Sequence, residues 1–240
     1  MDQMRSLFAS LLSEKGILLT DEQWNRFETY YRLLLEWNER MNLTGITERE
    51  QVYIKHFYDS LSLSFFVPLA EVSNIADIGS GAGFPSIPLK IMFPHLRVTI
   101  IDSLNKRIQF LKHLTSELAF TDVDCIHARA EDAGRDSKFR DRFDLVTARA
   151  VARLNVLNEF CLPFVKTGGT FAAMKGADAE EEVQEARFSL SQLKGELLRS
   201  EKFLLPVEQS TRHIILIRKT GPTPPKYPRK PGVPLKQPLK

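Results

Sequence analysis

A glycine-rich stretch, Asp77-Ile-Gly-Ser-Gly-Ala-Gly-Phe-Pro85, combines residue types that are suited to binding a ligand. Glycines at 79, 81 and 83 let the backbone turn tightly or approach a ligand closely, because no Cβ intrudes. A phosphate-binding P-loop is excluded, since no Gly-Lys-Ser/Thr follows. The dinucleotide motif G-x-G-x-x-G requires glycine or alanine at position 84, which is phenylalanine. The stretch therefore predicts a different ligand, or only a tight strand-to-helix turn.

Asp77 narrows the choice of ligand through its charge. A carboxylate beside the loop would repel a pyrophosphate, whereas it would attract a ligand that carries a cation. S-adenosylmethionine has an ammonium group and a sulfonium and contains no phosphate, so it is the predicted ligand. Asp77 either orients the loop or meets the ammonium through water. Alternatively, its carboxylate interacts with the dipole of the following helix.

The glycine stretch lies at a strand-to-helix junction in a chain of alternating elements. Strands are expected at 74–78, 97–102, 122–128, 143–149, 169–175, 196–205 and 212–218, with helices at 85–93, 105–119, 151–166 and 178–194. Such units predict an α/β fold, a Rossmann-like parallel sheet with helices on both faces. The short turn between the last two strands predicts a terminal antiparallel hairpin. Open sheets of this kind bind ligands beyond the carboxyl ends of their strands.

The two ends of the chain differ from this central part. Residues 1–70 are expected to form a helical segment packed on the core, with helices near 3–13, 21–41 and 48–65. Thr20 is a plausible N-cap of the second helix, and its helically spaced apolar side chains are interpreted as core packing rather than a base-stacking surface; these are Trp24, Phe27, Tyr31, Leu34 and Met41. We expect the α/β domain to span 71–219, followed by an extended, basic, proline-rich segment at 220–240 rather than another packed element.

Composition limits the classes of function. The content of 43% hydrophobic and 26% charged residues is typical of a globular protein. Cys125 and Cys161 match no metal spacing, so neither a metal site nor a disulfide is expected. No secretory signal and no apolar run near the ~20 residues of a membrane span occur, which predicts a cytoplasmic protein without a membrane partner. From Gln209 onward there are eight Lys or Arg and no acid, which favours a polyanionic partner such as nucleic acid.

Two levels of family resemblance follow from these motifs. The order of Asp77-x-Gly79-x-Gly81-x-Gly83, Asp102, Glu131 and the terminal hairpin resembles class I S-adenosylmethionine-dependent methyltransferases. The segments EWNERMNLTGIT, KHFYDSL, DIGSGAGFPSIPLKI, IDSLNKRIQFL, ARAED, DLVTARAVA and KYPRKPGVPLKQPL resemble the bacterial 16S ribosomal RNA guanine-N7 methyltransferases, the glucose-inhibited division protein B family. Ser86 departs from the glycine expected there. The resemblance implies methylation of a guanine in the decoding-region loop of 16S RNA, with S-adenosylhomocysteine as the product.

The resemblance also implies a set of cofactor contacts. It assigns them to Asp77, Gly79, Gly81, Gly83, Phe84, Asp102, Ala130, Glu131 and Arg149. Asp102 would accept hydrogen bonds from both ribose hydroxyls, and the alternative for it is an N-cap of the helix that starts near Asn105. Ala130 and Glu131 would contact the adenine, and the alternative for them is a plain strand end.

Arg149 ends the fourth strand, where class I methyltransferases present the target. Exocyclic-amine enzymes carry an Asn/Asp-Pro-Pro-aromatic run there, and pyrimidine C5 enzymes need a nucleophilic cysteine; TARAVARL offers neither. Guanine N7 has an in-plane lone pair and loses no proton, so the enzyme needs alignment and charge management more than a base. Arg149 and Arg129 are the predicted catalytic, positioning residues, with a structural salt bridge as the alternative for each.

The RNA contacts are predicted from charge around the same sheet edge and in the tail. They comprise Lys55, His56, Arg129, Lys175, Arg212, Lys226, Arg229 and Lys230. For His56 the alternative is a structural role, and for the tail it is a strap packed on the domain. The expected partner is the small ribosomal subunit and the expected state a monomer. A ribosome assembly factor that senses S-adenosylmethionine without turnover stays open as an alternative, and Phe84 disfavours a nicotinamide-dependent dehydrogenase.

Overall fold

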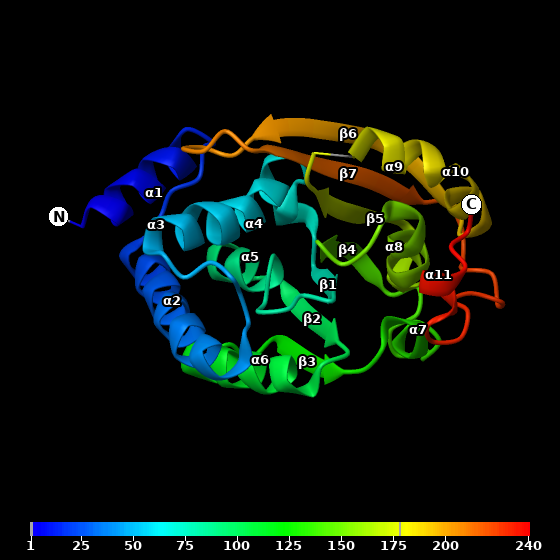
Figure 1. Ribbon diagram of the computed structural model, residues 1–240, viewed down its shortest axis with the longest axis horizontal. Helices are drawn as coiled ribbons and strands as arrows, with labels where there is room; N and C mark the ends of the chain where they lie inside the picture. Colours follow the sequence, from blue (N-terminus) through cyan, green and yellow to red (C-terminus); the bar gives the residue numbers. More distant parts are fainter. Residues whose placement is uncertain (1, 178) are drawn as a thin grey trace.

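The computed structural model describes residues 2–177 and 179–240, and a seven-stranded sheet organises them (Figure 1). The strands are β1 Asn74–Ile78, β2 Arg97–Asp102, β3 Val123–His127, β4 Phe143–Arg149, β5 Val165–Lys175, β6 Gly195–Leu204 and β7 Thr211–Lys219, in the order β3-β2-β1-β4-β5-β7-β6. The first five run parallel, and β7 is antiparallel to β5 and β6. This confirms the predicted α/β sheet with its terminal hairpin. The strand order reverses at β1, which lies between β2 and β4 in the sheet. This switch point places a ligand crevice at the carboxyl ends of these strands.

The helices agree with prediction where their sequence period is regular. They are α1 Gln3–Ser13, α2 Asp21–Met41, α3 Arg49–Val52, α4 Asp59–Leu61, α5 Ser86–Met92, α6 Asn105–Glu117, α7 Ala130–Ala133, α8 Leu154–Cys161, α9 Ala179–Glu185, α10 Arg187–Gln192 and α11 Val233–Lys236. The short helices α7 and α11 were not predicted. The helix expected at 178–194 is two helices, and residue 178 lies outside the described residues.

Two predicted helices, those at 48–65 and 151–166, are wrong in extent. The first consists of α3, a π-helical turn Tyr53–Tyr58, α4 and a 3-10 turn Ser62–Phe65. Within it, Ser60, Ser62 and Ser64 donate to carbonyls three or four residues back, at 2.5 to 2.7 Å, and such bonds compete with the regular helical pattern. The second begins only at Leu154, whose N–H donates to Glu182 of α9. A 3-10 turn Leu162–Phe164 follows it, and a further one lies at Leu69–Glu71.

Helix α2 shows how local sequence sets its limits. Thr20 and Gln23 form a reciprocal capping box at its start, which confirms the predicted N-cap, and Asn42 ends the helix in the left-handed conformation. Its aromatic stripe packs in the core as predicted, since Trp24, Phe27 and Leu34 are buried, while Tyr31 and Met41 are half-buried.

Alternating side chains divide the core between the two faces of the sheet. Ile75, Leu145 and Ile214 pack with the N-terminal helices, α5 and α6. Their chain neighbours Ala76, Val146 and Ile215 pack with α7 to α10. This is the period-two pattern of a strand covered on both faces. The N-terminal helices thus share a core with one face of the sheet, and Figure 1 shows them on the side of α5 and α6, away from α8. The division of the chain at residues 70 and 219 stays a prediction.

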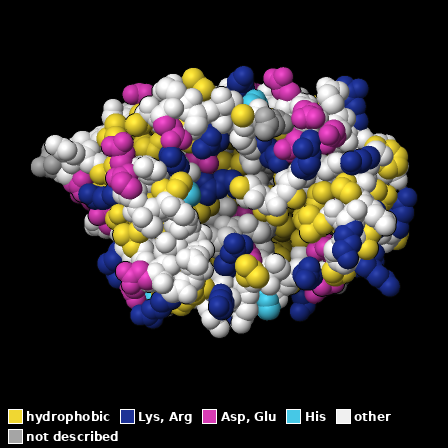
Figure 2. All heavy atoms as spheres, viewed as in Figure 1, with side chains coloured by type: hydrophobic (Ala, Val, Ile, Leu, Met, Phe, Trp, Pro, Cys, Tyr) yellow, Lys and Arg dark blue, Asp and Glu magenta, His cyan; other side chains and the backbone are white. Residues whose placement is uncertain are grey.

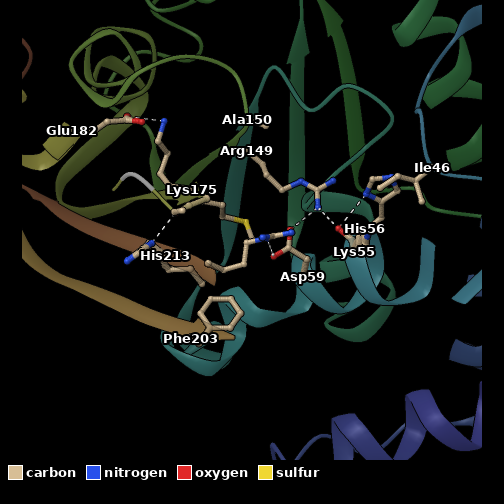
Figure 3. Close-up of a pocket in the computed structure, with 15 residues that line it drawn as sticks. Ile46, Lys55, His56, Asp59, Arg149, Ala150, Lys175, Glu182, Phe203 and His213 are labelled. Carbon is tan, nitrogen blue, oxygen red and sulfur yellow. Dashed lines mark hydrogen bonds and ion pairs between the residues drawn. The ribbon is translucent and has the colours of Figure 1, made fainter. Parts of the chain in front are cut away.

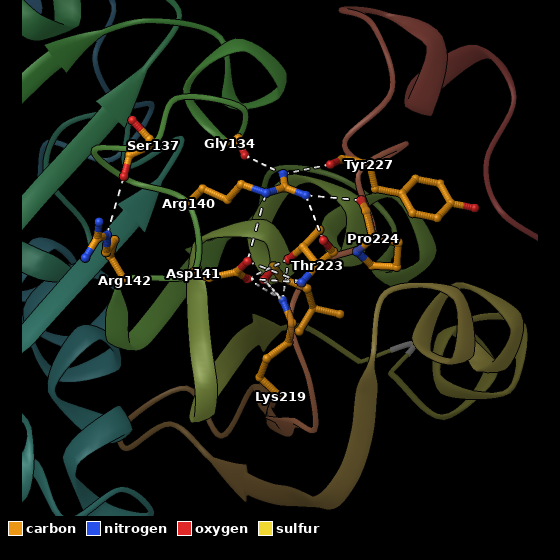
Figure 4. A network of polar contacts seen from close by, with 10 residues as sticks. Gly134, Ser137, Arg140, Asp141, Arg142, Lys219, Thr223, Pro224 and Tyr227 are labelled. Atoms are coloured by element: carbon orange, nitrogen blue, oxygen red, sulfur yellow. Dashed lines mark hydrogen bonds and ion pairs between the residues drawn. The ribbon is translucent and has the colours of Figure 1, made fainter.

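The C-terminal residues 220–240 are packed on the domain, which agrees with the packed strap that the sequence offered as the alternative for the tail. Tyr227 and Leu239 are buried in the second core cluster. Arg140 donates to the carbonyls of Thr223, Pro224 and Tyr227 (Figure 4). The many prolines lack N–H groups for a sheet or helix, so other groups of the domain bind the carbonyls of this segment. We call residues 220–240 the strap.

Within the part of the chain that the structure describes, no helix combines the length and the apolar character that a bilayer span requires.

Candidate functional site

Three neighbouring cavities lie at the carboxyl ends of the central strands. We name them the Asp102 cavity, of about 400 Å³, the glycine-loop cavity, of about 180 Å³, and the Arg149 cavity, of about 410 Å³. Gly79 lines the first two, and Arg149 lines the last two. Ala150, which follows β4 with a left-handed φ of 55°, lines all three. The three cavities are therefore adjacent, and the glycine-loop cavity lies between the other two.

The glycines at 79, 81 and 83 have different surroundings, although all three have positive φ. A Cβ on Gly83 would lie 2.8 Å from Ile87 and 2.9 Å from the Tyr30 hydroxyl. A Cβ on Gly79 would lie 2.9 Å from Val151. A Cβ on Gly81 would meet no described atom within 4 Å. Gly83 and Gly79 thus fit the alternative of a tight turn, whereas Gly81 leaves open space of the kind a ligand needs.

Asp77 faces the start of α5 from a fully buried position. Its Oδ2 accepts from the Ser86 N–H at 3.2 Å, and its Oδ1 has no hydrogen-bond partner among the described residues. Burial raises the pKa of this carboxyl to about 7, against the opposing effect of the Ser86 hydrogen bonds. Asp77 thus makes the contact with the start of α5 that the sequence offered as the alternative. Its second oxygen, Oδ1, can accept a hydrogen bond from another group.

Asp102 binds both the glycine loop and the residue that precedes α6. Its Oδ2 accepts from the Gly81 N–H at 3.1 Å, and its Oδ1 accepts from the Leu104 N–H at 2.8 Å. Leu104, not Asp102, precedes the helix, so the N-cap alternative is wrong. Arg107 pairs with Asp102 at 3.5 Å and lines the same cavity. Sequence reasoning missed Arg107, although its place five residues after an acid that ends a strand was a usable signal.

The segment ARAED and the strap together form the remaining wall of the Asp102 cavity. Ala130, Glu131 and Arg129 line this cavity, and Arg129 is exposed. One carboxylate oxygen of the buried Glu131 accepts from the Gly232 N–H at 2.8 Å. Leu235 of the strap completes the wall. Leu235 was not predicted, because nothing in the sequence indicates that the tail returns to this edge of the sheet.

The residues around these cavities fit S-adenosylmethionine. Gly81 leaves a cradle that a larger side chain would occupy. The carboxylates of Asp102 and Glu131 line one cavity and suit hydroxyl and amine donors. The unpaired Oδ1 of Asp77 is an acceptor at a buried position near the loop, and it suits a cation.

Phe84 is enclosed by an aromatic and cationic stack. Tyr30 stacks at 5.4 Å between ring centroids, His56 at 4.6 Å, and the Arg149 guanidinium carbon lies 4.7 Å from the Phe84 centroid. Tyr30 also donates to the Ala82 carbonyl at 2.5 Å, which ties the glycine loop to α2.

His56 is neutral and fixed by two hydrogen bonds. Its Nδ1 donates to the Lys55 carbonyl, so its Nε2 accepts from the Thr44 hydroxyl at 2.8 Å. Burial, followed by the nearby Arg149 charge, lowers its pKa to about 3. His56 thus has the structural role that the sequence offered as the alternative. This geometry does not support a charged RNA contact from His56. Thr44, from EWNERMNLTGIT, was missed.

Arg149 is held at the end of β4 by a residue that was not predicted (Figure 3). Its Nη1 donates to Asp59 Oδ2 at 3.0 Å and to the Lys55 carbonyl at 3.3 Å. The ion pair offered as the alternative for Arg149 is therefore present, while the side chain also lines two cavities. Asp59 is the one acid of the apolar run HFYDSLSLSFF, which was a usable signal.

The other predicted RNA residues near the Arg149 cavity are also paired with acids. Lys55 pairs with Glu208 at 2.7 Å, Lys175 with Glu182 at 2.7 Å, and Arg212 with Asp59 at 3.4 Å. Figure 2 shows Lys and Arg side chains interspersed with acidic ones over this face. The cavity is therefore lined by cations whose charge is largely balanced.

The tail residues predicted to bind RNA divide into two groups. Arg229 donates to the buried Glu159, with its Nη2 at 2.6 Å from Oε2, which ties the strap to α8. Lys226 and Lys230 are exposed. The structure thus gives Arg229 a strap role and leaves the other two on the surface.

Comparisons with known proteins agree with this geometry. The chain matches the GidB family model, described as rRNA small subunit methyltransferase G, over residues 23–215. The protein named Ribosomal RNA small subunit methyltransferase G from Geobacillus sp. (strain WCH70) is 56% identical over 232 residues, 97% of this chain and 98% of that protein. Its namesake from Brevibacillus brevis is 55% identical with the same coverage. A crystal structure of a SAM-dependent methyltransferase from Aquifex aeolicus has a TM-score of 0.52 at 15% identity, covers 72% of this chain and 94% of that one, and supports the fold alone.

Proposed function

Because the chain belongs to the GidB family of small-subunit ribosomal RNA methyltransferases, we propose that it methylates N7 of a guanine in 16S RNA, with S-adenosylmethionine as the methyl donor. One observation carries the proposal: Arg149 lines both the glycine-loop cavity and the Arg149 cavity, so it stands between a cofactor site and a site for the base. The methyltransferase relatives favour this over a cofactor-sensing assembly factor or a dehydrogenase.

The chain's own residues divide the work of binding. Asp102, Glu131 and Ala130 line the cavity proposed for the nucleoside part of the cofactor, and Gly79 and Gly81 line the one proposed for its methionine part. Asp77 is fully buried and lines none of the three cavities, so it would orient the loop or meet the ammonium through water. Phe84 and Gly83 shape the loop. The bound cofactor supplies a methyl group activated by a sulfonium. We propose that the protein acts as a monomer.

Arg149 has a restricted role in transfer to N7. The N7 lone pair forms the new bond to the methyl carbon while the carbon–sulfur bond breaks, and no proton leaves the base. A hydrogen bond donated to N7 would occupy that lone pair, so Arg149 must donate elsewhere. O6, the adjacent acceptor on the same edge of guanine, is the atom that we assign to it. Arg129, exposed at the rim of the Asp102 cavity, is proposed as a second positioning residue.

The RNA itself requires contacts beyond the base. Lys55, Lys175 and Arg212 are proposed to meet the phosphates around the Arg149 cavity, and Lys226 and Lys230 those further along the strap. His56 and Arg229 stay predictions as RNA residues and have structural partners in the folded chain.

The function is tested by labelling. Purified protein is incubated with labelled S-adenosylmethionine and 30S particles from a strain that lacks this gene, and the modified nucleotide is mapped by mass spectrometry. We expect label at N7 of one guanine of 16S RNA. Label at another atom or no label refutes the proposal. Cofactor binding without label would favour the assembly-factor alternative.

Asp77 is expected to make the stability of the ligand-free protein depend on pH. Its pKa of about 7 in the folded chain exceeds the value of about 3.9 in an unfolded chain. The folded state therefore holds the proton more tightly, and this stabilisation is complete below about pH 4 and is lost as the pH rises through 7. The unfolding free energy of Asp77→Asn, measured in urea against the wild type, should rise between pH 4 and 8. A pH-independent difference contradicts this.

Leu235 is expected to contribute to cofactor affinity from the strap. It lines the Asp102 cavity and is 56% exposed, so a ligand there would cover it. Leu235→Ser should weaken binding of S-adenosylmethionine about fivefold, which corresponds to about 1 kcal/mol of lost apolar contact. Calorimetry measures the Kd. Leu18→Ser, at an 80% exposed leucine that lines none of these cavities, is the control and should leave Kd unchanged; equal affinities in both variants would contradict the prediction.

A further inference from the structure

Asp59 is a buried acid shared by two arginines from different strands. It begins α4, directly after the π-helical turn, and its side chain is 7% exposed. Its Oδ2 accepts from Arg149 Nη1 at 3.0 Å, and its Oδ1 lies 3.4 Å from Arg212 Nε. Arg149 ends β4 and Arg212 lies in β7, with β5 between them in the sheet. One carboxylate from the N-terminal helices thus joins side chains from both sides of β5.

The location of this carboxylate has an energetic cost that its two partners offset. Burial raises the pKa of Asp59, while the charges of Arg149 and Arg212 lower it. Without the carboxylate, two partly buried guanidinium groups would face the same cavity with no shared counter-ion. Loss of one partner of a buried pair is far more damaging than loss of an exposed pair. The arrangement of Arg149 and Arg212 therefore depends on Asp59.

The contacts of Arg149 leave a defined part of its guanidinium for the base. Nη1 is bound by Asp59 and the Lys55 carbonyl, and the planar group lies over the Phe84 ring. In residues 2–177 and 179–240, neither Nε nor Nη2 has a hydrogen-bond partner. These three contacts fix the orientation of the guanidinium group, and with it the direction in which Nε and Nη2 point. Rotation of the group by loss of Asp59 would turn Nη1 toward the base and misplace the other donors.

We propose that Asp59 is a positioning residue for methyl transfer, which holds Arg149 for the guanine O6 and balances the positive charge that the base acquires. This inference rests on the proposed function. When N7 bonds to the methyl carbon and the electron pair of the broken bond stays on sulfur, the positive charge moves to the guanine ring. That ring then lies beside two arginines, and the carboxylate between them lowers the cost of the new charge.

The test compares Asp59→Asn with a matched change elsewhere. Misplacement of a positioning group by about 1 Å costs on the order of 10²-fold in rate, and we expect kcat to fall by that factor, with Kd for S-adenosylmethionine and KM for 30S particles within about threefold of the wild type. Asp144→Asn is the control. Asp144 lies near the start of β4, at the end of the strands opposite to the cavities, where it is ion-paired with Lys166 and accepts from the Ser73 and Asn74 N–H groups. This variant should lose stability and keep kcat.

A second measurement shows whether Asp59 acts through Arg149. In an Arg149→Met background, Asp59→Asn should lower kcat by clearly less than the 10²-fold expected when Arg149 is present, because the group that it positions is gone and only the effect of its charge on the base remains. Multiplicative effects of the two changes would overturn the inference, as would full kcat in Asp59→Asn. Should Asp59→Asn not fold, Asp59→Glu decides, since it keeps the charge and displaces the carboxylate. A tenfold or larger fall in its kcat supports positioning, and wild-type kcat refutes it. A wild-type protein that places no label on guanine N7 refutes the proposed function itself.

Discussion

Replacing Arg149 with methionine is expected to lower kcat for guanine methylation about 10³-fold, as does removal of a preorganised donor from other active sites. The side chain lies over Phe84, is held by Asp59, and lines both cavities proposed for the reacting groups. Methionine keeps much of the apolar stem and removes every donor. Single-turnover labelling of 30S particles measures the chemical step, and calorimetry measures cofactor affinity. The affinity should change less than about fivefold, because Arg149 lines the cavity proposed for the methionine part but not the Asp102 cavity proposed for the nucleoside.

Arg149→Lys separates the effect of geometry from the effect of charge. Lysine keeps a cation but lacks the planar fork that can satisfy Asp59 and the base together. We therefore expect kcat of Arg149→Lys to exceed that of Arg149→Met by no more than about tenfold. Arg32→Met, at an exposed arginine paired with Glu36 on α2, is the control for a lost arginine and should leave kcat unchanged. A wild-type rate in Arg149→Lys would show that only the charge matters, and a wild-type rate in Arg149→Met would exclude Arg149 from the reaction.

The parts of the fold that sequence predicted well are those that local rules determine. Strand boundaries follow from short apolar runs, such as those that end at Asp102 in β2 and at Arg149 in β4. Helix α2 follows from its capping box and its apolar period. The strand β5 begins at Val165 rather than at 169, because Val165 pairs with Phe143 across a register shift. The helix predicted at 48–65 is wrong in extent because hydrophobic periodicity does not show where serine hydroxyls donate to backbone carbonyls and disturb the helix.

The candidate site was predicted where the chain itself carries the motif and missed where tertiary contacts create it. Asp77, Asp102 and the glycines lie on one strand-to-helix unit and its neighbour, so their proximity follows from parallel topology. Asp59 and Leu235 reach the cavities from the two ends of the chain, and no spacing relates them to Arg149 or Glu131. For the cations of the Arg149 cavity, the sequence offered an ion pair as the alternative only for Arg149, whereas each of them has an acidic partner that only the folded structure brings near.

Replacing Gly81 with valine is expected to weaken the binding of S-adenosylmethionine about 100-fold, which corresponds to about 2.8 kcal/mol. A side chain at 81 would project into open space of the glycine-loop cavity, where a Cβ meets no described atom within 4 Å. The left-handed φ of 64° adds strain of about 1–2 kcal/mol to the folded state. The N–H that donates to Asp102 is kept, so the loop retains its anchor to β2.

Gly16→Val is the matched control, because it separates strain from obstruction. Gly16 has a similar φ of 74°, and a Cβ there also meets nothing within 4 Å, but it follows α1 far from the glycine loop along the chain. Both variants should lose similar unfolding free energy in urea, since both place a β-branched residue in the left-handed region. Only Gly81→Val should lose cofactor affinity in calorimetry. Equal affinities would mean that the space at Gly81 lies outside the cofactor site, and the assignment of the glycine loop to the methionine part would then be wrong.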